Sequence, residues 1–348
     1  MLLVFGLAAL LWGLGTLLKT PIQARVLMIA LLYVGVLMLH IVLPEGHPLR
    51  ETTGGSAALW LMLGGAIGLV LAYREGLKFL RSKASAKESA AQEPTVAGTF
   101  REAELTRYAR HIVLREVGGV GQKALKTSSV LVVGAGGLGS PALQYLCAAG
   151  VGTVGVVDDD VVDSANLHRQ VIHKDGSIGM PKVFSAQKEM EAQNPFVTVK
   201  PYKRRLDAET AVELFKEYDV VLDGTDNFET RYLVNQAAVR TGTPLVSGAL
   251  TQWEGQLSVF DPKAGTPCYR CVFPEAPDPA LAPPCSEAGV IGPLPGVVGT
   301  MMALEAIKVI TGAGHAMLSE MLIYDGLYGE TRKISLKPRA DCPVCGAH

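Results

Sequence analysis

The sequence VLVVGAGGLG at residues 130–139 decides the fold. Its four leading apolar residues are typical of a buried strand, and its glycines turn into a segment, 140–149, with Pro141 near its start and apolar residues on one face. A second apolar run, 154–157, ends at Asp158. Strand, glycine turn, helix and strand in this order predict a βαβ unit that binds a nucleotide, because the amides at a helix N-terminus stabilise phosphate.

The alternation of strands and helices continues toward the C-terminus. Residues 219–223 and 244–247 are apolar runs typical of buried strands, and 257–260 alternates as an added antiparallel strand does. We therefore predict an α/β domain over 100–348, with a doubly wound, Rossmann-like and mostly parallel sheet. Ligands bind such sheets beyond the carboxyl ends of the parallel strands, so the polar residues that follow these strands should converge.

Two cations near the glycine turn favour one nucleotide reaction over another. The turn and Asp158, which suits a pair of ribose hydroxyls, are equally typical of an NAD-dependent dehydrogenase. Arg169, within NLHRQ at 166–170, and Lys182 add positive charge beside the turn. Attack at phosphorus builds negative charge that such cations stabilise, whereas hydride transfer has no use for them. Cleavage of ATP is therefore the better interpretation, with solvated surface charges as the alternative.

An acidic turn, DGTDN at 223–227, follows a predicted buried strand and should emerge at the same edge of the sheet. Asp226 is suited to hold Mg²⁺, which binds through one or two carboxylates together with substrate phosphates. Asn227 can supplement it. The alternative is that these side chains only cap the following helix.

The cysteines divide into two CxxC pairs and two single residues. We expect the α/β domain to lie in the cytoplasm, where disulfides are disfavoured. Four thiolates at this spacing therefore indicate a structural Zn²⁺ that joins the C-terminal tail to the middle of the domain. Two redox-active pairs are the alternative. Cys147 is expected in the core, and Cys285, in a Pro-rich stretch, is either a nucleophile or a loop thiol without chemistry. The expected zinc ligands are Cys268, Cys271, Cys342 and Cys345.

The N-terminal part has a different composition. Only five charged side chains fall in the first 73 residues, and three apolar runs, 1–18, 26–43 and 57–73, approach the roughly 17–25 residues that cross a membrane as a helix. We predict three transmembrane helices within 1–75 and a flexible linker over 76–99. A cleaved signal peptide and buried core helices are the alternatives.

Basic residues beside the apolar runs predict the orientation of the membrane region. Lys19 and Arg25 flank the first loop, and Arg74 begins a basic stretch after the third run. By the positive-inside rule, we expect a multi-pass protein of the inner, cytoplasmic membrane with its catalytic domain in the cytoplasm. The formal net charge of −1 offers no concentrated basic surface, so nucleic acid is not expected as a partner.

From about Arg107 to Cys345 the chain resembles the ubiquitin-activating-type adenylyltransferases of the MoeB, ThiF and HesA group. The resemblance rests on order and spacing together, and the chain departs from it at Ala165 and Gly224, where the family commonly has Ser and Cys. The matching motifs are Arg107-Tyr108-Ala109-Arg110, the glycine turn, Asn166 to Gln170, Asp223 to Asn227, both CxxC pairs and Glu287-Ala288-Gly289-Val290.

The resemblance implies ATP-dependent adenylation of the C-terminal glycine carboxylate of a ubiquitin-like sulfur-carrier protein. It favours a MoaD-like carrier that serves molybdopterin synthesis. The alternatives are a ThiS-like carrier for thiamine synthesis and a catalytically silent membrane scaffold. The sulfur would come from a separate persulfide donor. The resemblance also implies a homodimer in which Arg110 reaches the neighbouring site, and sulfur transfer or a thioester at Cys285. With the motifs above, the expected nucleotide site comprises Gly134, Gly136, Gly137, Gly139, Asp158, Asp160, Asn166, Arg169, Gln170, Lys182, Asp226 and Asn227. The expected catalytic residues are Arg169, Lys182 and Asp226 from this site, together with Arg110 and Cys285.

Overall fold

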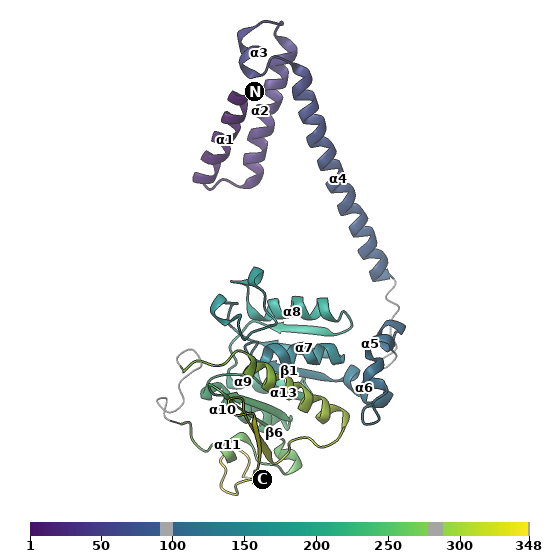
Figure 1. Cartoon of the computed structure of the whole chain (residues 1–348), viewed down its shortest axis with the longest axis vertical. Coiled ribbons are helices and arrows are strands. Elements are labelled where there is room, and N and C mark those ends of the chain that lie inside the picture. Colours follow the sequence, from purple (N-terminus) through teal and green to yellow (C-terminus); the bar gives the residue numbers. More distant parts are fainter. Residues whose placement is uncertain (91–99, 278–287, 347–348) are drawn as a thin grey trace. The chain divides into compact units, whose positions relative to one another are not determined.

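The structure, a computed structural model, describes residues 1–90, 100–277 and 288–346 and divides into two compact units, Met1–Pro94 and Thr95–His348 (Figure 1). Cys285 and Glu287 therefore lie outside the described residues. Each unit has a hydrophobic core of its own.

The first unit is helical (Figure 1). It contains α1 (Leu2–Leu17), α2 (Ile22–Val42), α3 (Pro48–Thr53) and α4 (Ala57–Ala90). Trp60 joins the helices, because its indole Nε1 donates to the Thr53 carbonyl at 3.1 Å and its own carbonyl accepts from Tyr33 Oη at 2.7 Å. Val4 and Val36 pack against the same indole.

Most of the apolar surface of this unit faces outward. The segments Ile22–Val42 and Pro48–Leu77 are long and apolar enough to cross a membrane, and only 11% and 6% of their most apolar windows are buried. Helix α1, with 16 residues, is just short of a typical span. Apolar N-terminal helices are thus present, where the sequence predicts them.

Helix α4 continues further than the composition suggests. It extends to Ala90, so the first part of the segment predicted as a linker is helical, and residues 91–99 lie outside the described part of the chain. The reason is that six of the nine residues 82–90 are Ala, Lys or Glu, which have high helix propensity even where they cannot form a core.

The second unit is built on one sheet of eight strands, in the order β3-β2-β1-β4-β5-β6-β7-β8. The first five in this order are parallel to their neighbours, and the pairs from β5 to β8 are antiparallel. This confirms the predicted Rossmann-like, mostly parallel sheet and the antiparallel addition. The strands are β1 (Ser129–Val133), β2 (Thr153–Val157), β3 (Thr198–Tyr202), β4 (Val220–Asp223), β5 (Leu245–Leu250), β6 (Glu254–Phe260), β7 (Glu320–Asp325) and β8 (Glu330–Ser335).

Helices cover both faces of the sheet, so the central strands are buried on both sides and need no polar face. One core contains Val130 and Val132 with residues of α7, α8 and α13, and the other contains Leu131 and Val133 with residues of α9 and α10. The helices of this unit are α5 (Glu102–Ile112), α6 (Gly118–Thr127), α7 (Gly139–Ala149), α8 (Lys182–Gln193), α9 (Ala208–Phe215), α10 (Phe228–Thr241), α11 (Tyr269–Val272) and α13 (Pro293–Thr311), with short 3-10 turns at Ser164–Asn166, Asp175–Ser177 and Pro262–Ala264.

Helix α13 is also long and apolar enough to cross a membrane by length and composition. Its apolar residues have a different explanation, because Val298, Met302 and Ala306 are buried in the core against α7 and the sheet. The hydropathy of this helix therefore reflects its packing inside the α/β unit.

Candidate active site

A cavity of about 1160 Å³ opens at the carboxyl ends of the parallel strands. It begins where the ends of β1 and β4 lie side by side. There the Gly224 amide donates to the Val133 carbonyl at 2.9 Å. The strand order reverses at β1, with β2 and β3 on one side and β4 and β5 on the other. A crevice at such a switch point is the usual ligand site of a doubly wound sheet.

The glycine turn between β1 and α7 forms one wall of the cavity. A Cβ at Gly139 would lie 1.8 Å from the Gly134 carbonyl oxygen, so only glycine allows the helix to begin this close to the strand. The backbone amides of Gly136, Gly137 and Leu138 have no hydrogen-bond acceptor among the described residues. Free amides at a helix N-terminus are donors suited to phosphate.

Asp158 lies at the end of β2, beside the turn. Its Oδ2 accepts from the Ala135 amide and its Oδ1 from the Asp160 amide, both at 2.8 Å. Burial raises the pKa of this carboxyl, while the nearby Lys182 ammonium and the two amides oppose the rise. Each oxygen has a second lone pair, so the side chain can still accept from ribose hydroxyls.

The two predicted cations both line the cavity. Lys182 is the first residue of α8; its side chain is 5% exposed, and its Nζ lies 2.7 Å from Oδ2 of Asp160, which is 67% exposed. The Arg169 guanidinium donates to Asn166 Oδ1 at 2.6 Å. Neither cation is simply a solvated surface charge, because each is held in a specific position by a neighbouring acceptor.

Gln170 has an unsatisfied atom in the cavity wall. Only 5% of the residue is exposed, and its Oε1 has no hydrogen-bond partner among the described residues. A buried carbonyl oxygen without a donor costs free energy.

The acidic turn after β4 has divided roles. Asp226 is exposed to the cavity, and its carboxylate has no partner within the described part of the chain, so it is available to a metal ion. Asn227 caps α10 by accepting from the Thr230 amide at 2.9 Å, which is the alternative anticipated from the sequence. Asp223 is buried and accepts from the Thr225 amide and hydroxyl.

Two of the expected catalytic residues are not among the described residues that line this cavity. Arg110 lies on the exposed side of α5 and is absent from the residues that line the cavity of this single chain. Cys285 lies outside the described residues. Cys147 lies in the core, where burial raises the pKa of its thiol to about 12.

Sequence reasoning missed several cavity residues. Arg204 and Arg205 follow β3, and Trp253 and Leu327 lie in the turns after β5 and β7; all four line the cavity. The two arginines could have been found, since β3 is parallel to β2 and its carboxyl end must reach the same edge. The two turns belong to the antiparallel part of the sheet, which this rule does not cover.

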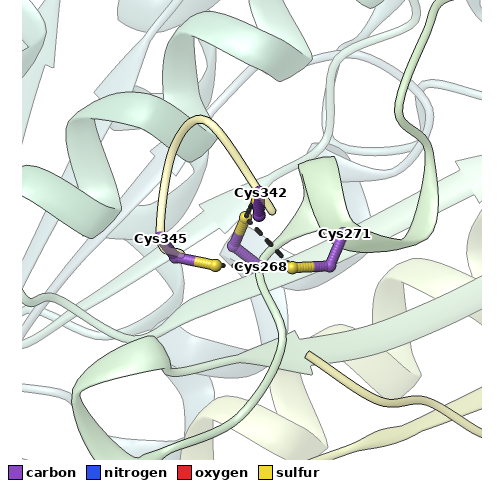
Figure 2. Close-up of side chains that lie close together, drawn as sticks. All are labelled: Cys268, Cys271, Cys342 and Cys345. Carbon is purple, nitrogen blue, oxygen red and sulfur yellow. Dashed lines mark hydrogen bonds between the residues drawn. The ribbon is translucent and has the colours of Figure 1, made fainter. Parts of the chain in front are cut away.

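The four cysteines of the CxxC pairs meet at one point, with their sulfurs directed toward one another (Figure 2). The Sγ–Sγ distances are 4.0 Å for Cys268–Cys271, 3.7 Å for Cys268–Cys342 and 3.4 Å for Cys271–Cys345. Sulfurs at the ~2.3 Å Zn–S distance of a tetrahedral site lie roughly 3.8 Å apart, whereas a disulfide requires about 2.05 Å. The cluster therefore fits a zinc site and not two disulfides.

The surroundings of the cluster also fit a metal. The Arg339 amide donates to Cys271 Sγ at 3.4 Å, which is the kind of contact that stabilises a thiolate ligand. Three of the four cysteines are buried. The cluster ties the segment after β8 to α11.

Comparisons with known proteins agree with this geometry. A family model described as the ThiF family matches residues 108–344. The sulfur carrier protein adenylyltransferase of Thermus thermophilus is 52% identical over 247 residues, which cover 70% of this chain and 91% of that protein. The SAMP-activating enzyme E1 of Haloferax volcanii is 48% identical over 243 residues, covering 70% and 89%. A crystal structure of E. coli MccB shares the fold, with a TM-score of 0.61 at 21% identity over 69% of this chain and 73% of that one.

Proposed function

The chain belongs to the ThiF family of E1-like adenylyltransferases, and from this membership we propose that it uses ATP to adenylate the C-terminal carboxylate of a ubiquitin-like sulfur-carrier protein. The observation that carries the proposal is the cavity at the switch point, where free amides of the glycine turn lie beside two held cations. Such a site is suited to a reaction that builds negative charge on phosphate oxygens.

The reaction follows from this arrangement. The carrier's terminal carboxylate oxygen attacks the α-phosphorus of ATP, the new O–P bond forms as the bond to the β-phosphate oxygen breaks, and pyrophosphate leaves with that electron pair. Lys182 and Arg169 stabilise the charge that develops on the phosphates. Asp226 would hold Mg²⁺, which supplies further positive charge at the phosphates when ATP is bound.

The cavity has room for more than the nucleotide. Its volume of about 1160 Å³ exceeds the roughly 300–1,000 Å³ of most small-molecule pockets. Trp253 and Leu327 give part of its wall an apolar surface suited to the extended end of a protein chain. We propose a MoaD-like carrier of molybdopterin synthesis as this partner; a ThiS-like carrier of thiamine synthesis is the alternative.

Further features belong to the same proposal. A separate persulfide donor would convert the acyl-adenylate to a thiocarboxylate, with Cys285 as a candidate for sulfur transfer. The active form would be a homodimer in which Arg110, exposed on α5, reaches the site of the neighbouring subunit. The zinc held by the cysteine cluster would be structural, since four thiolates leave no open coordination position.

We also propose that the first unit anchors the enzyme in the cytoplasmic membrane. The support is the outward-facing apolar surface of α2 and α4, which would be costly to expose to water. The basic residues beside these helices favour a cytoplasmic catalytic unit. Fractionation of cells should place the chain with membranes, and residues 100–348 alone should stay soluble and keep full activity; a soluble full-length chain would contradict the anchor.

The test of the activity is ATP–pyrophosphate exchange against a panel of purified carrier proteins that end in glycine. We expect exchange with one carrier, loss of exchange when that carrier lacks its terminal glycine, and loss of exchange in a folded Arg169→Ala enzyme. If purified enzyme with magnesium and ATP forms no acyl-adenylate with any carrier, the activity assignment fails and a silent scaffold is favoured.

A further inference from the structure

A buried histidine lies behind the glycine turn. His173 is only 4% exposed and does not line the cavity. Its Nε2 lies 2.9 Å from the Ala135 carbonyl oxygen, and its Nδ1 lies 3.0 Å from Ser185 Oγ on α8. The proposed reaction does not use this imidazole, yet it contacts the backbone of the turn directly.

We propose that His173 is a positioning residue that aims the Gly136 amide at the phosphates of ATP. The proposal rests on the proposed function, because it requires a phosphate at the turn. His173 touches neither ATP nor the carrier, and it acts through the peptide that joins Ala135 to Gly136.

The geometry of that peptide carries the argument. No peptide bond of the described chain is cis, so the Ala135 carbonyl and the Gly136 amide point in opposite directions from one plane. A donor on the buried side that holds the carbonyl therefore directs the amide away from the core. Gly136 lines the cavity, and its amide has no acceptor among the described residues.

Ala135 is held from both sides. Its amide donates to Asp158 Oδ2 at 2.8 Å, and its carbonyl accepts from His173 at 2.9 Å. The ring bridges the turn to α8, which also carries Lys182 at its start. Without the histidine the peptide could rotate, because the glycine on its far side imposes little conformational restriction.

The protonation state of the ring suits this role. A carbonyl only accepts, so Nε2 must carry the proton and donate it, and Nδ1 can then accept from the Ser185 hydroxyl. Burial lowers the pKa of His173, and the hydrogen bond to the Ala135 carbonyl opposes this as the next largest effect. The charges of Lys182 and Lys174 lower the pKa further, against a smaller opposing effect of Glu189. The neutral ring keeps one donor and one acceptor, which match its two partners.

A purely structural histidine would give a different result. Its loss would loosen the whole nucleotide site, so adenosine and ATP would both bind less well. A positioning role predicts a split, because adenosine lacks the phosphates that the Gly136 amide contacts. Comparing the two ligands therefore separates the two roles.

The experiment measures dissociation constants of ATP and adenosine by calorimetry with the full chain and without carrier. For His173→Ala we expect ATP affinity to fall roughly tenfold or more, the effect of losing a hydrogen bond to a charged group, with adenosine affinity unchanged. His173→Gln, whose amide can donate near the position of Nε2, should recover part of the loss. Ser185→Ala should weaken ATP in the same direction by less.

The control is Met190→Ala, which opens a cavity in the core beside α8 but leaves the turn untouched. It should show no split between the two ligands. Equal weakening of ATP and adenosine in His173→Ala, or unchanged ATP affinity in a folded variant, would overturn the proposal. Absence of exchange with every carrier would remove the proposed activity but leave this split intact, so the two failures are distinguishable.

Discussion

Replacement of Lys182 by methionine removes a buried, ion-paired positive charge from the wall of the cavity. The lysine side chain is 5% exposed, and its ammonium lies 2.7 Å from the carboxylate of Asp160. Methionine is unbranched and fills much of the space of the lysine stem, so the packing of α8 should be kept. The substitution therefore tests the charge and not the shape of the side chain.

The expected loss can be estimated from burial. Unit charges about 4 Å apart contribute ~4 kcal/mol at an effective dielectric constant near 20, and the partner Asp160 reduces this by neutralising part of the ammonium charge. Loss of one preorganised donor at a site of developing charge typically lowers kcat by roughly 10²–10³-fold. Stability should change by less than about 1 kcal/mol, because Asp160 is 67% exposed and water can solvate its freed carboxylate.

The assay is ATP–pyrophosphate exchange with the carrier that the wild-type enzyme accepts, together with urea unfolding of both proteins. Lys188→Met is the matched control, since Lys188 is an exposed residue of the same helix and lies outside the cavity. It should exchange at the wild-type rate. If folded Lys182→Met exchanges within about threefold of wild type at saturating ATP, Lys182 does not stabilise the transition state.

Three further outcomes are expected. Elemental analysis should find one zinc ion per wild-type chain; Cys342→Ser should lose this metal and melt at a lower temperature, whereas Cys147→Ser should keep the metal. A wild-type chain without zinc, or a Cys342→Ser variant with the wild-type Tm, would contradict a structural site. Arg231→Met should lower the free energy of unfolding, measured by urea titration, by about 3–5 kcal/mol, because it leaves the 1% exposed Asp223 without its ion-pair partner. Adding Asp223→Asn to this variant should restore part of the lost free energy. If the effects of the two substitutions simply add, the two side chains do not interact. Because the pKa of His173 is lowered in the folded protein, the unfolded chain takes up a proton on this side chain first as the pH falls below about 6.5. The free energy of unfolding should therefore decrease as the pH is lowered further, and it should decrease less steeply in His173→Gln. Parallel pH profiles of the two proteins would refute this contribution.

Much of the fold could be predicted from local patterns. The apolar runs at 130–133, 219–223 and 244–247 correspond to β1, β4 and β5, and the alternating run at 257–260 lies in β6, antiparallel to β5. Strands buried on both faces have continuous apolar sequences, which makes them easy to recognise. The edge strand β8 has no buried residue, so its sequence carries no comparable signal.

The site was less predictable than the fold. Motif spacing identified Asp158, Arg169 and Lys182, all of which line the cavity. It did not identify Arg204, because its place depends on where β3 lies in the sheet. Nor did it single out His173, whose contacts are with a carbonyl 38 residues away and a hydroxyl on the next helix.

The sequence by itself determined the βαβ unit, the order of the motifs and the pairing of cysteines within each CxxC, because each of these depends on spacing along a few neighbouring residues. Only the tertiary structure decided that Lys182 is held by Asp160 and that an imidazole supports the glycine turn from behind. Such contacts join residues far apart in the chain, and their existence depends on strand order and on the packing of helices against the sheet, which no local pattern encodes.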